Sequence, residues 1–131
     1  MWLYKNLKIR DLSDIPEGVV GFVYMISNPD TKEYYFGKKS CYSNRTLKPL
    51  KGYKRKRKVT KESDWVSYQS SNNVVKSWNN AKKEILHYCY TKKEMTYYEL
   101  QAILCTDGLT DSRCLNENAL GKFFKNEFKN D

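Results

Sequence analysis

Two tyrosines and a nearby group of cations are the strongest candidates for a catalytic site in this chain. Tyr24 and Tyr35 lie eleven positions apart, on either side of a segment of turn-forming residues. A tyrosine with a pKa of about 10 is a poor base unless nearby cations lower that value, and Lys38, Lys39 and Arg45 follow the second tyrosine. Aromatic residues on paired strands are more often cross-strand packing than catalytic groups. The pair therefore needs support from residues further along the chain.

The charge of the chain is concentrated in one basic segment. The 131 residues include 24 Lys and Arg against 15 Asp and Glu, a formal charge of +9. Between residues 38 and 61 there are eleven basic residues and no acidic one. Such a segment fits contacts with the phosphate backbone of a nucleic acid; the alternative is a solvated charged loop or a nuclear-localisation-like patch. We predict nucleic-acid contacts from Lys38, Lys48, Lys51, Lys54, Arg55, Lys56, Arg57, Lys58 and Lys61.

The secondary structure expected around these residues begins with a β-hairpin. Residues 19–27 and 32–38 are rich in β-branched and aromatic side chains, and Asn28-Pro29-Asp30-Thr31 between them has the chemistry of a tight turn. Pro49 and Gly52 then break any helix across the basic segment, which predicts a mobile basic loop.

The second half of the chain predicts one strand and several helices. Residues 83–90 alternate in part and indicate a third strand, and Thr91 begins a capping box for a helix that ends before Asp107-Gly108. Short helices are expected to start at Ser63-Asp64 and at Ser70-Ser71, and a last helix in the tail from Asn116 to Asp131.

These elements predict an α/β (α+β) fold with a small three-stranded, mainly antiparallel sheet flanked by helices. The length fits a single domain, residues 1–131, with a basic insertion at about residues 45–62. No apolar run reaches the roughly 20 residues of a membrane helix, and the first residues lack the pattern of a signal peptide. Four widely spaced cysteines and one histidine disfavour a zinc site and favour reduced thiols.

At the hairpin the sequence resembles the GIY-YIG endonuclease superfamily. Val23-Tyr24 and Tyr35-Phe36-Gly37 stand where that superfamily has its two tripeptide motifs. Arg45 lies eight residues beyond the second motif. Glu99 lies within the expected helix and Asn116 follows it by 17 residues. This is the order in which the superfamily places its Arg, its metal-binding Glu and its Asn.

Further strings resemble the version of this module found in free-standing homing endonucleases of large bacteriophages. They are Lys38-Lys39-Ser40 and Glu62-Ser63-Asp64-Trp65, followed by Tyr68 and Ser70-Ser71. The resemblance implies a DNA endonuclease, of homing or restriction-like type, that acts in the cytoplasm, which is the host's if a phage encodes it.

The resemblance also implies roles for the hairpin and the basic segment. Tyr24 would be the general base, and Tyr35 would orient the water or a phosphate oxygen. Arg45 would hold the scissile phosphate by a bidentate contact, although Arg55 or Arg57 could take that place. Hydrolysis of a phosphodiester by water requires a base, cations and a Lewis acid, which agrees with these residue types.

The remaining site residues are more ambiguous. Glu99 would bind one Mg²⁺ or Mn²⁺ ion, because Mg²⁺ often uses one or two protein carboxylates; the alternative is an exposed helix carboxylate. Asn116 is either a site residue or a cap. Some members of the superfamily have a His four residues after the Arg, where this chain has Pro49. That role passes to Lys39 or is absent.

A rival hypothesis is a non-catalytic nucleic-acid-binding module on the same fold. It is favoured by the strings Phe22-Val23-Tyr24 and Tyr35-Phe36-Gly37, which differ from the consensus tripeptides. The joint presence of the Tyr, Arg, Glu and Asn residues argues for the nuclease. DNA is the expected partner, with structured RNA, a homodimer and a specificity-conferring protein partner left open.

Overall fold

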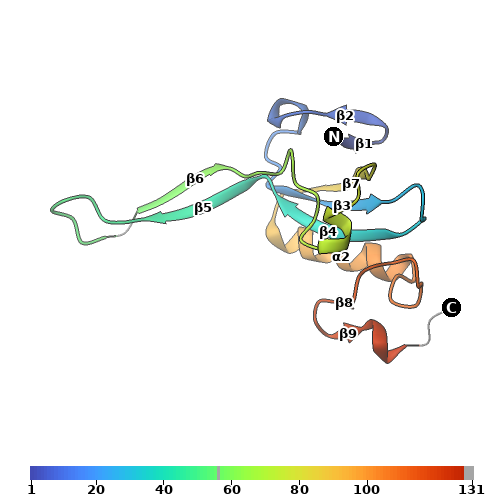
Figure 1. The fold of residues 1–131 in the computed structure, drawn as a ribbon. Coiled ribbons are helices and arrows are strands. Elements are labelled where there is room, and N and C mark those ends of the chain that lie inside the picture. The colour runs from blue at the N-terminus through green and yellow to red at the C-terminus, as the bar shows by residue number, and fades with distance from the viewer. Residues whose placement is uncertain (56, 129–131) are drawn as a thin grey trace.

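A computed structural model describes residues 1–55 and 57–128 of the chain, with only the backbone of residues 45–47, 57 and 58 (Figure 1). The elements are β1 (Trp2–Tyr4), β2 (Leu7–Ile9), the 3₁₀ helix η1 (Leu12–Asp14), β3 (Gly21–Ser27), β4 (Tyr34–Ser40), β5 (Tyr42–Leu47), β6 (Arg57–Glu62), α1 (Asn73–Lys76), β7 (Lys82–Cys89), α2 (Lys92–Cys105), β8 (Asn118–Ala119), β9 (Phe123–Phe124) and the 3₁₀ helix η2 (Lys125–Glu127).

The main sheet has five strands in the order β2-β1-β7-β3-β4. Strand β1 is parallel to β7, and the other pairs are antiparallel. The expectation of three strands was wrong because β1 and β2, three residues each, are too short to give a periodic pattern. Lys5 and Asn6 join them with φ values of 48° and 68°, as in a type I′ turn. The mixed α+β class is confirmed.

The elements nearest the predicted site are confirmed. Strands β3 and β4 form the expected hairpin, β7 is the expected third strand, and α2 follows it. The Thr91 side chain accepts a hydrogen bond from the Glu94 backbone N–H (3.1 Å), and the Glu94 carboxylate accepts one from the Tyr90 N–H (2.9 Å). The capping signal in the sequence thus sets where α2 begins.

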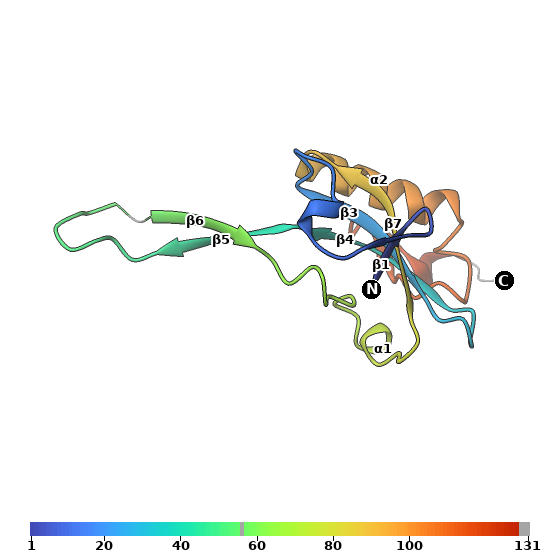
Figure 2. The ribbon, with the colours of Figure 1, turned by 90° about the horizontal axis from the view of Figure 1, so that it is seen from above.

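The basic segment is a two-stranded ribbon rather than a loop. Strands β5 and β6 pair antiparallel from Tyr42↔Glu62 to Leu47↔Arg57, apart from the main sheet. Figures 1 and 2 show this ribbon projecting from the body of the molecule. Pro49 and Gly52 lie between the strands, where they form its tip instead of breaking up the whole segment. We call residues 42–62 the basic ribbon.

Three predicted helices were wrong in position or in kind. Residues 65–67 form only a turn, and the next helix, α1, is capped by Asn72 rather than by Ser70-Ser71. The tail forms the short pair β8–β9 instead of a helix. Leu120 and Gly121 have φ values of 57° and 66°, which a right-handed helix excludes and a tight turn requires.

The two faces of the sheet are covered by different segments (Figure 2). Helix α2 packs on one face through Met95 and Ile103. Residues 63–81, including α1, cover the other face, where Trp65 meets Trp2 and Phe22 in the main core. Trp65 is fully buried, as expected of a core tryptophan. Successive side chains of a strand point to opposite faces of the sheet, so this alternation decides which side chains contact each covering segment.

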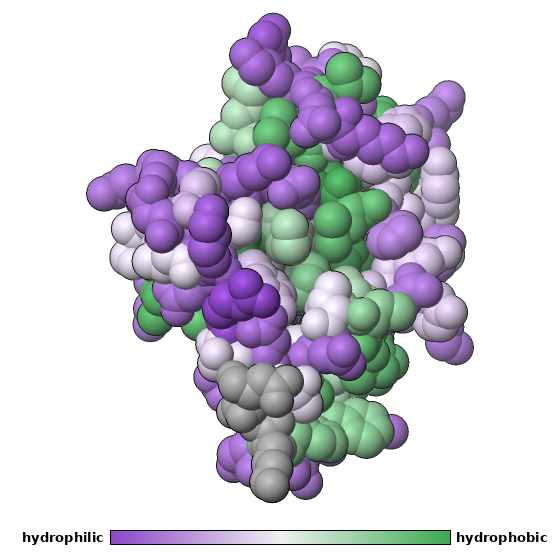
Figure 3. Space-filling view, turned by 90° about the vertical axis from the view of Figure 1, so that its right-hand side faces the viewer, coloured by the Kyte–Doolittle hydropathy of each residue, from purple (hydrophilic) through white to green (hydrophobic). Residues whose placement is uncertain are grey.

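The rest of the surface adds three observations. Figure 3, a view of the side away from the basic ribbon, shows apolar side chains among polar ones. Among the described residues, Cys41, Cys89 and Cys114 are buried free thiols and Cys105 is an exposed one. No helix in the described part of the chain has both the length and the hydropathy to cross a membrane.

Candidate active site

Tyr24 is held in place by its neighbours on both adjacent strands. It pairs with Gly37 of β4, and a β-bulge in the β3–β7 pairing lies between Val23 and Tyr24. The ring of Tyr24 lies against Gly37, because a Cβ built at Gly37 would overlap its hydroxyl oxygen and Cζ. The glycine of the second motif is thus required by the tyrosine of the first. Bulges commonly re-aim a side chain beside an active site.

Three tyrosines gather on this face of the sheet. Tyr35 lies two residues before Gly37 on β4, so its side chain shares the face of Tyr24. Tyr68, from the covering segment, meets Tyr24 edge to face with ring centroids 6.1 Å apart. Tyr35 and Tyr68 both pack against the core cluster that contains Tyr24. We call Tyr24, Tyr35 and Tyr68 the tyrosine cluster.

The environment of the cluster favours neutral phenols. Burial raises the pKa of Tyr24 well above its usual range, and the charge of Tyr68 adds to this shift, while a hydrogen bond with Ser70 opposes it. Burial also raises the pKa of Tyr35. The expected lowering of these pKa values by nearby cations is therefore not found in the free protein. The buried phenols are hydrogen-bond donors at neutral pH.

Two consecutive lysines of β4 point to opposite faces. The Lys39 ammonium lies 2.6 Å from an Asp64 oxygen and 4.1 Å from the centroid of the Tyr68 ring. It thus borders the tyrosine cluster. The Lys38 ammonium instead donates to Thr96 Oγ1 of α2 at 2.9 Å. Of the two, Lys39 is the cation that the fold brings to the cluster.

Glu99 lies on α2, which packs on the other face of the sheet. Burial raises the pKa of its carboxyl, and the charge of Lys38 opposes that shift. The charge of Glu99 in turn contributes to the raised pKa of Tyr35. Strand β4 is the edge of the sheet, so groups from both faces can meet there. The predicted carboxylate and the second tyrosine are therefore electrostatically coupled across this edge.

Asn116 seals the outer edge of β4. Its Oδ1 accepts a hydrogen bond from the Phe36 N–H (2.9 Å), and its Nδ2 donates to the Phe36 carbonyl (2.8 Å). The residue is 4 % exposed. Both halves of the amide are thus used to satisfy the outward-facing backbone groups of Phe36 on this strand edge. A further role of Asn116 in the reaction stays a prediction.

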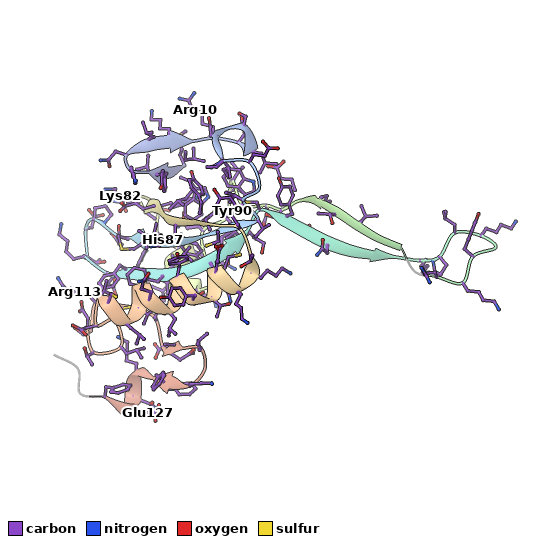
Figure 4. All side chains as sticks on the ribbon, turned by 180° about the vertical axis from the view of Figure 1, so that it is seen from behind. Arg10, Lys82, His87, Tyr90, Arg113 and Glu127 are labelled. Atoms are coloured by element: carbon purple, nitrogen blue, oxygen red, sulfur yellow. The ribbon has the colours of Figure 1, made fainter. Side chains whose placement is uncertain are left out.

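The predicted cations of the basic ribbon lie away from the tyrosine cluster. Arg45 pairs with Val59 within the ribbon. The side chains of Arg45, Arg57 and Lys58, and all of Lys56, lie outside the residues that the structure describes. The remaining predicted cations of the ribbon are all solvent-exposed: Lys48, Lys51, Lys54, Arg55 and Lys61. Figure 4 shows long side chains reaching outward at the far end of the ribbon.

A buried lysine that was not among the predicted site residues anchors the backbone next to the tyrosine cluster. Lys83 of β7 is 5 % exposed, and burial lowers its pKa. Its ammonium donates to the carbonyls of Tyr68 (2.8 Å) and Val66 (3.3 Å) and lies 4.6 Å from the centroid of the Trp2 ring. These bonds fix the backbone that carries Tyr68. A buried cation is tolerated because its donors are satisfied.

Ser70 is the second residue that sequence reasoning missed. It is fully buried and adopts φ = 75°, an uncommon conformation for a residue other than glycine. Its hydroxyl accepts a hydrogen bond from the Asn72 N–H (3.0 Å). The signal in the sequence for Tyr68 and Ser70 is their place among the strings that resemble those of phage homing endonucleases. His87, the single histidine of the sequence, is not part of this arrangement. It stacks on Tyr98 of α2 with ring centroids 4.4 Å apart.

Comparison with known proteins identifies a family that the sequence matches. A family model described as "Putative endonuclease segE, GIY-YIG domain" matches residues 2–126. No curated protein and no solved structure gives a significant match. The matched range includes the tyrosine cluster, Lys39, the basic ribbon, Glu99 and Asn116.

Proposed function

Because the chain belongs to the family of SegE-type GIY-YIG endonuclease domains, we propose that it hydrolyses DNA phosphodiester bonds with the help of a divalent cation. The observation that carries this proposal is the grouping of Tyr24 and Tyr35 on one face of the sheet, beside the Lys39 ammonium. The charge of Glu99 on α2 contributes to the raised pKa of Tyr35. A mere binding module needs cations but has no use for a carboxylate there.

The proposed chemistry assigns one task to each group. The phenolate form of Tyr24, which is the minor form at neutral pH because burial raises the pKa, takes the proton of the attacking water and becomes the neutral phenol. The Tyr35 hydroxyl donates a hydrogen bond to that water or to a phosphate oxygen. Lys39 neutralises charge that develops on the phosphate. Arg45 binds the scissile phosphate in our proposal, because Arg57 and Arg55 lie further along the ribbon, toward its tip. Asn116 holds β4, and therefore Tyr35, in register.

The residues at the edge of the sheet fit one divalent cation. The described part of the chain contains no group of three or more His, Cys, Asp or Glu that could hold a metal. A single carboxylate suits Mg²⁺ or Mn²⁺, which keep several waters. Partial burial raises the pKa of Glu99, so a bound cation would stabilise the charged form of its carboxyl. Glu99 would hold the ion, and the bound ion would supply a Lewis acid at the phosphate.

The basic ribbon is the proposed grip on the DNA backbone. Its cations stand on an arm outside the main sheet, where they can follow a duplex beyond the cut (Figure 2). We further propose that the enzyme is a bacteriophage-type homing or restriction-like nuclease. A monomer would nick DNA, whereas a homodimer would bring a second site for double-strand cleavage.

The test is cleavage of supercoiled plasmid with Mg²⁺ or with EDTA. The parent protein should convert plasmid to open circles or linear DNA only with metal, and Glu99→Gln should abolish conversion while retaining DNA binding. Glu17→Gln, which changes an exposed carboxylate near the N-terminus, is the matched control and should cut normally. Salt-sensitive binding without any cleavage by the parent would instead support the non-catalytic binding module.

A further inference from the structure

The tip of the basic ribbon presents two apolar side chains to solvent. Tyr53 is 71 % exposed and Leu50 is 50 % exposed. The Tyr53 N–H donates to the Leu50 carbonyl at 2.9 Å, which closes a four-residue turn. Gly52 has φ = 88° and nothing within 4 Å of a Cβ built on it, so its conformation, not lack of space, requires glycine. A closed turn holds its first and last Cα atoms within about 7 Å of each other.

Cations surround this apolar pair. Lys51 lies inside the turn, Lys48 lies just before it, and Lys54 and Arg55 follow it, all of them exposed. No salt bridge between described residues involves the ribbon. The tip therefore combines uncompensated positive charge with an aromatic ring that buries little surface in the free protein. That combination complements a nucleic acid, which has negatively charged phosphates and stacked planar bases.

We propose that the Leu50–Tyr53 turn is a wedge that inserts between base pairs of duplex DNA while the flanking cations bind phosphates. This inference rests on the proposed function and adds a second, non-catalytic contact to it. Proteins that unstack a base step use apolar side chains in this way and offset the unstacking by added contact surface. The turn hydrogen bond pre-forms the wedge, so little conformational entropy is lost when it inserts.

The reach of the ribbon sets where the wedge would act. Strand β5 has six residues, which span about 20 Å at the usual rise of a strand. The turn extends this to roughly 25 Å. The base of the ribbon lies beside β4. At about 3.4 Å per base pair, a length of about 25 Å along the duplex places the unstacked base step roughly seven base pairs from the base of the ribbon. The contact is therefore outside the base pairs that flank the cut.

The experiment separates this contact from cleavage. All proteins in this experiment, the parent included, carry Glu99→Gln, so that the DNA stays intact. Closed plasmid is relaxed by a topoisomerase with saturating protein, and the shift in linking number reports unstacking. Affinity for a mixed-sequence duplex is measured at several salt concentrations. The test variant is Tyr53→Ala, with Tyr53→Phe as the conservative variant. Tyr97→Ala is the control, because Tyr97 is 60 % exposed but lies on α2.

The wedge predicts a specific pattern. The parent should shift the topoisomer distribution, and Tyr53→Ala should abolish the shift and weaken duplex binding about tenfold or more. The salt slope should stay unchanged, since no charge is removed. Tyr53→Phe and Tyr97→Ala should behave as the parent, and replacing Lys51 and Lys54 by Gln should lower the salt slope by about 2.

Two outcomes would overturn the wedge while leaving the nuclease intact. One is a Tyr53→Ala variant with the parent's affinity and linking-number shift. The other is a loss of affinity that is equal for single-stranded DNA, which would mean stacking on unpaired bases. Failure of the parent to bind DNA at all would overturn both the wedge and the proposed function.

Discussion

The contact between Gly37 and Tyr24 gives the sharpest stability prediction. Gly37 lies in a strand without a positive φ, so alanine can adopt its backbone conformation. Without any contact, Gly→Ala in a strand should stabilise the protein by about 0.5–1 kcal/mol. Here the new methyl would overlap the Tyr24 ring, and overpacking of a core costs about 1–3 kcal/mol. We expect Gly37→Ala to be destabilising overall, and to reduce cleavage because it displaces Tyr24.

A double-mutant cycle isolates the contact. Tyr24→Leu removes the part of the ring that lies against Gly37 but keeps an apolar core side chain. In that background Gly37→Ala should be stabilising by its intrinsic gain alone, so the coupling free energy should equal the overpacking cost of about 1–3 kcal/mol. Urea denaturation followed by circular dichroism measures all four free energies of unfolding. An equal cost of Gly37→Ala in both backgrounds would refute the reasoning.

Three further predictions follow from the site and its supports. Asn116→Ala should lower the free energy of unfolding by about 2–4 kcal/mol, because it leaves both backbone groups of Phe36 without their side-chain partners; a thermal melt unchanged from the parent would contradict this. Because burial raises the pKa of Tyr24, cleavage should rise about tenfold per pH unit through neutral pH if its phenolate is the base, and a flat profile in stopped-time assays would remove Tyr24 from that role. The Tyr34 hydroxyl donates to Asp111 at 2.6 Å, and this bond, together with hydrogen bonds from Arg113, lowers the pKa of the Asp111 carboxyl to about 2. The folded pKa lies below the unfolded value of about 3.9, so the pair stabilises the protein above about pH 4 and this contribution is lost as the pH falls toward 2; the stability difference between Tyr34→Phe and the parent should shrink over that range in urea titrations.

The predicted elements that proved right depend on local chemistry. The turn after Ser27 and the capping residues of α2 act over four residues or fewer, so the sequence alone locates β3, β4 and the start of α2. The predicted elements that proved wrong depend on partners far along the chain. Strand β1 exists because it pairs with β7, about 80 residues later, and such a pairing leaves no local signal.

The basic ribbon shows the same division. Its charge and its helix-breaking residues can be read directly from the sequence, and so can the inference that it meets a polyanion. That its two halves pair into an arm depends on the register Tyr42↔Glu62, because cross-strand contacts decide strand formation in polar segments. The sequence gives no reason to distinguish Tyr53 from the other tyrosines. Its exposure, in the turn that joins the two strands of the arm, follows from the tertiary structure.

For the site, the residue types and their order can be read directly from the sequence: two tyrosines, an arginine, a glutamate and an asparagine. Tertiary structure decided which of them meet and in what state. It joined Tyr68 and Lys83 to the cluster, placed Lys39 rather than Lys38 beside it, and used both ends of the Asn116 amide on β4. It also raised the pKa of Tyr24. The physical reason is that burial and electrostatic coupling depend on distances in space, whereas sequence patterns record only short-range geometry and side-chain chemistry.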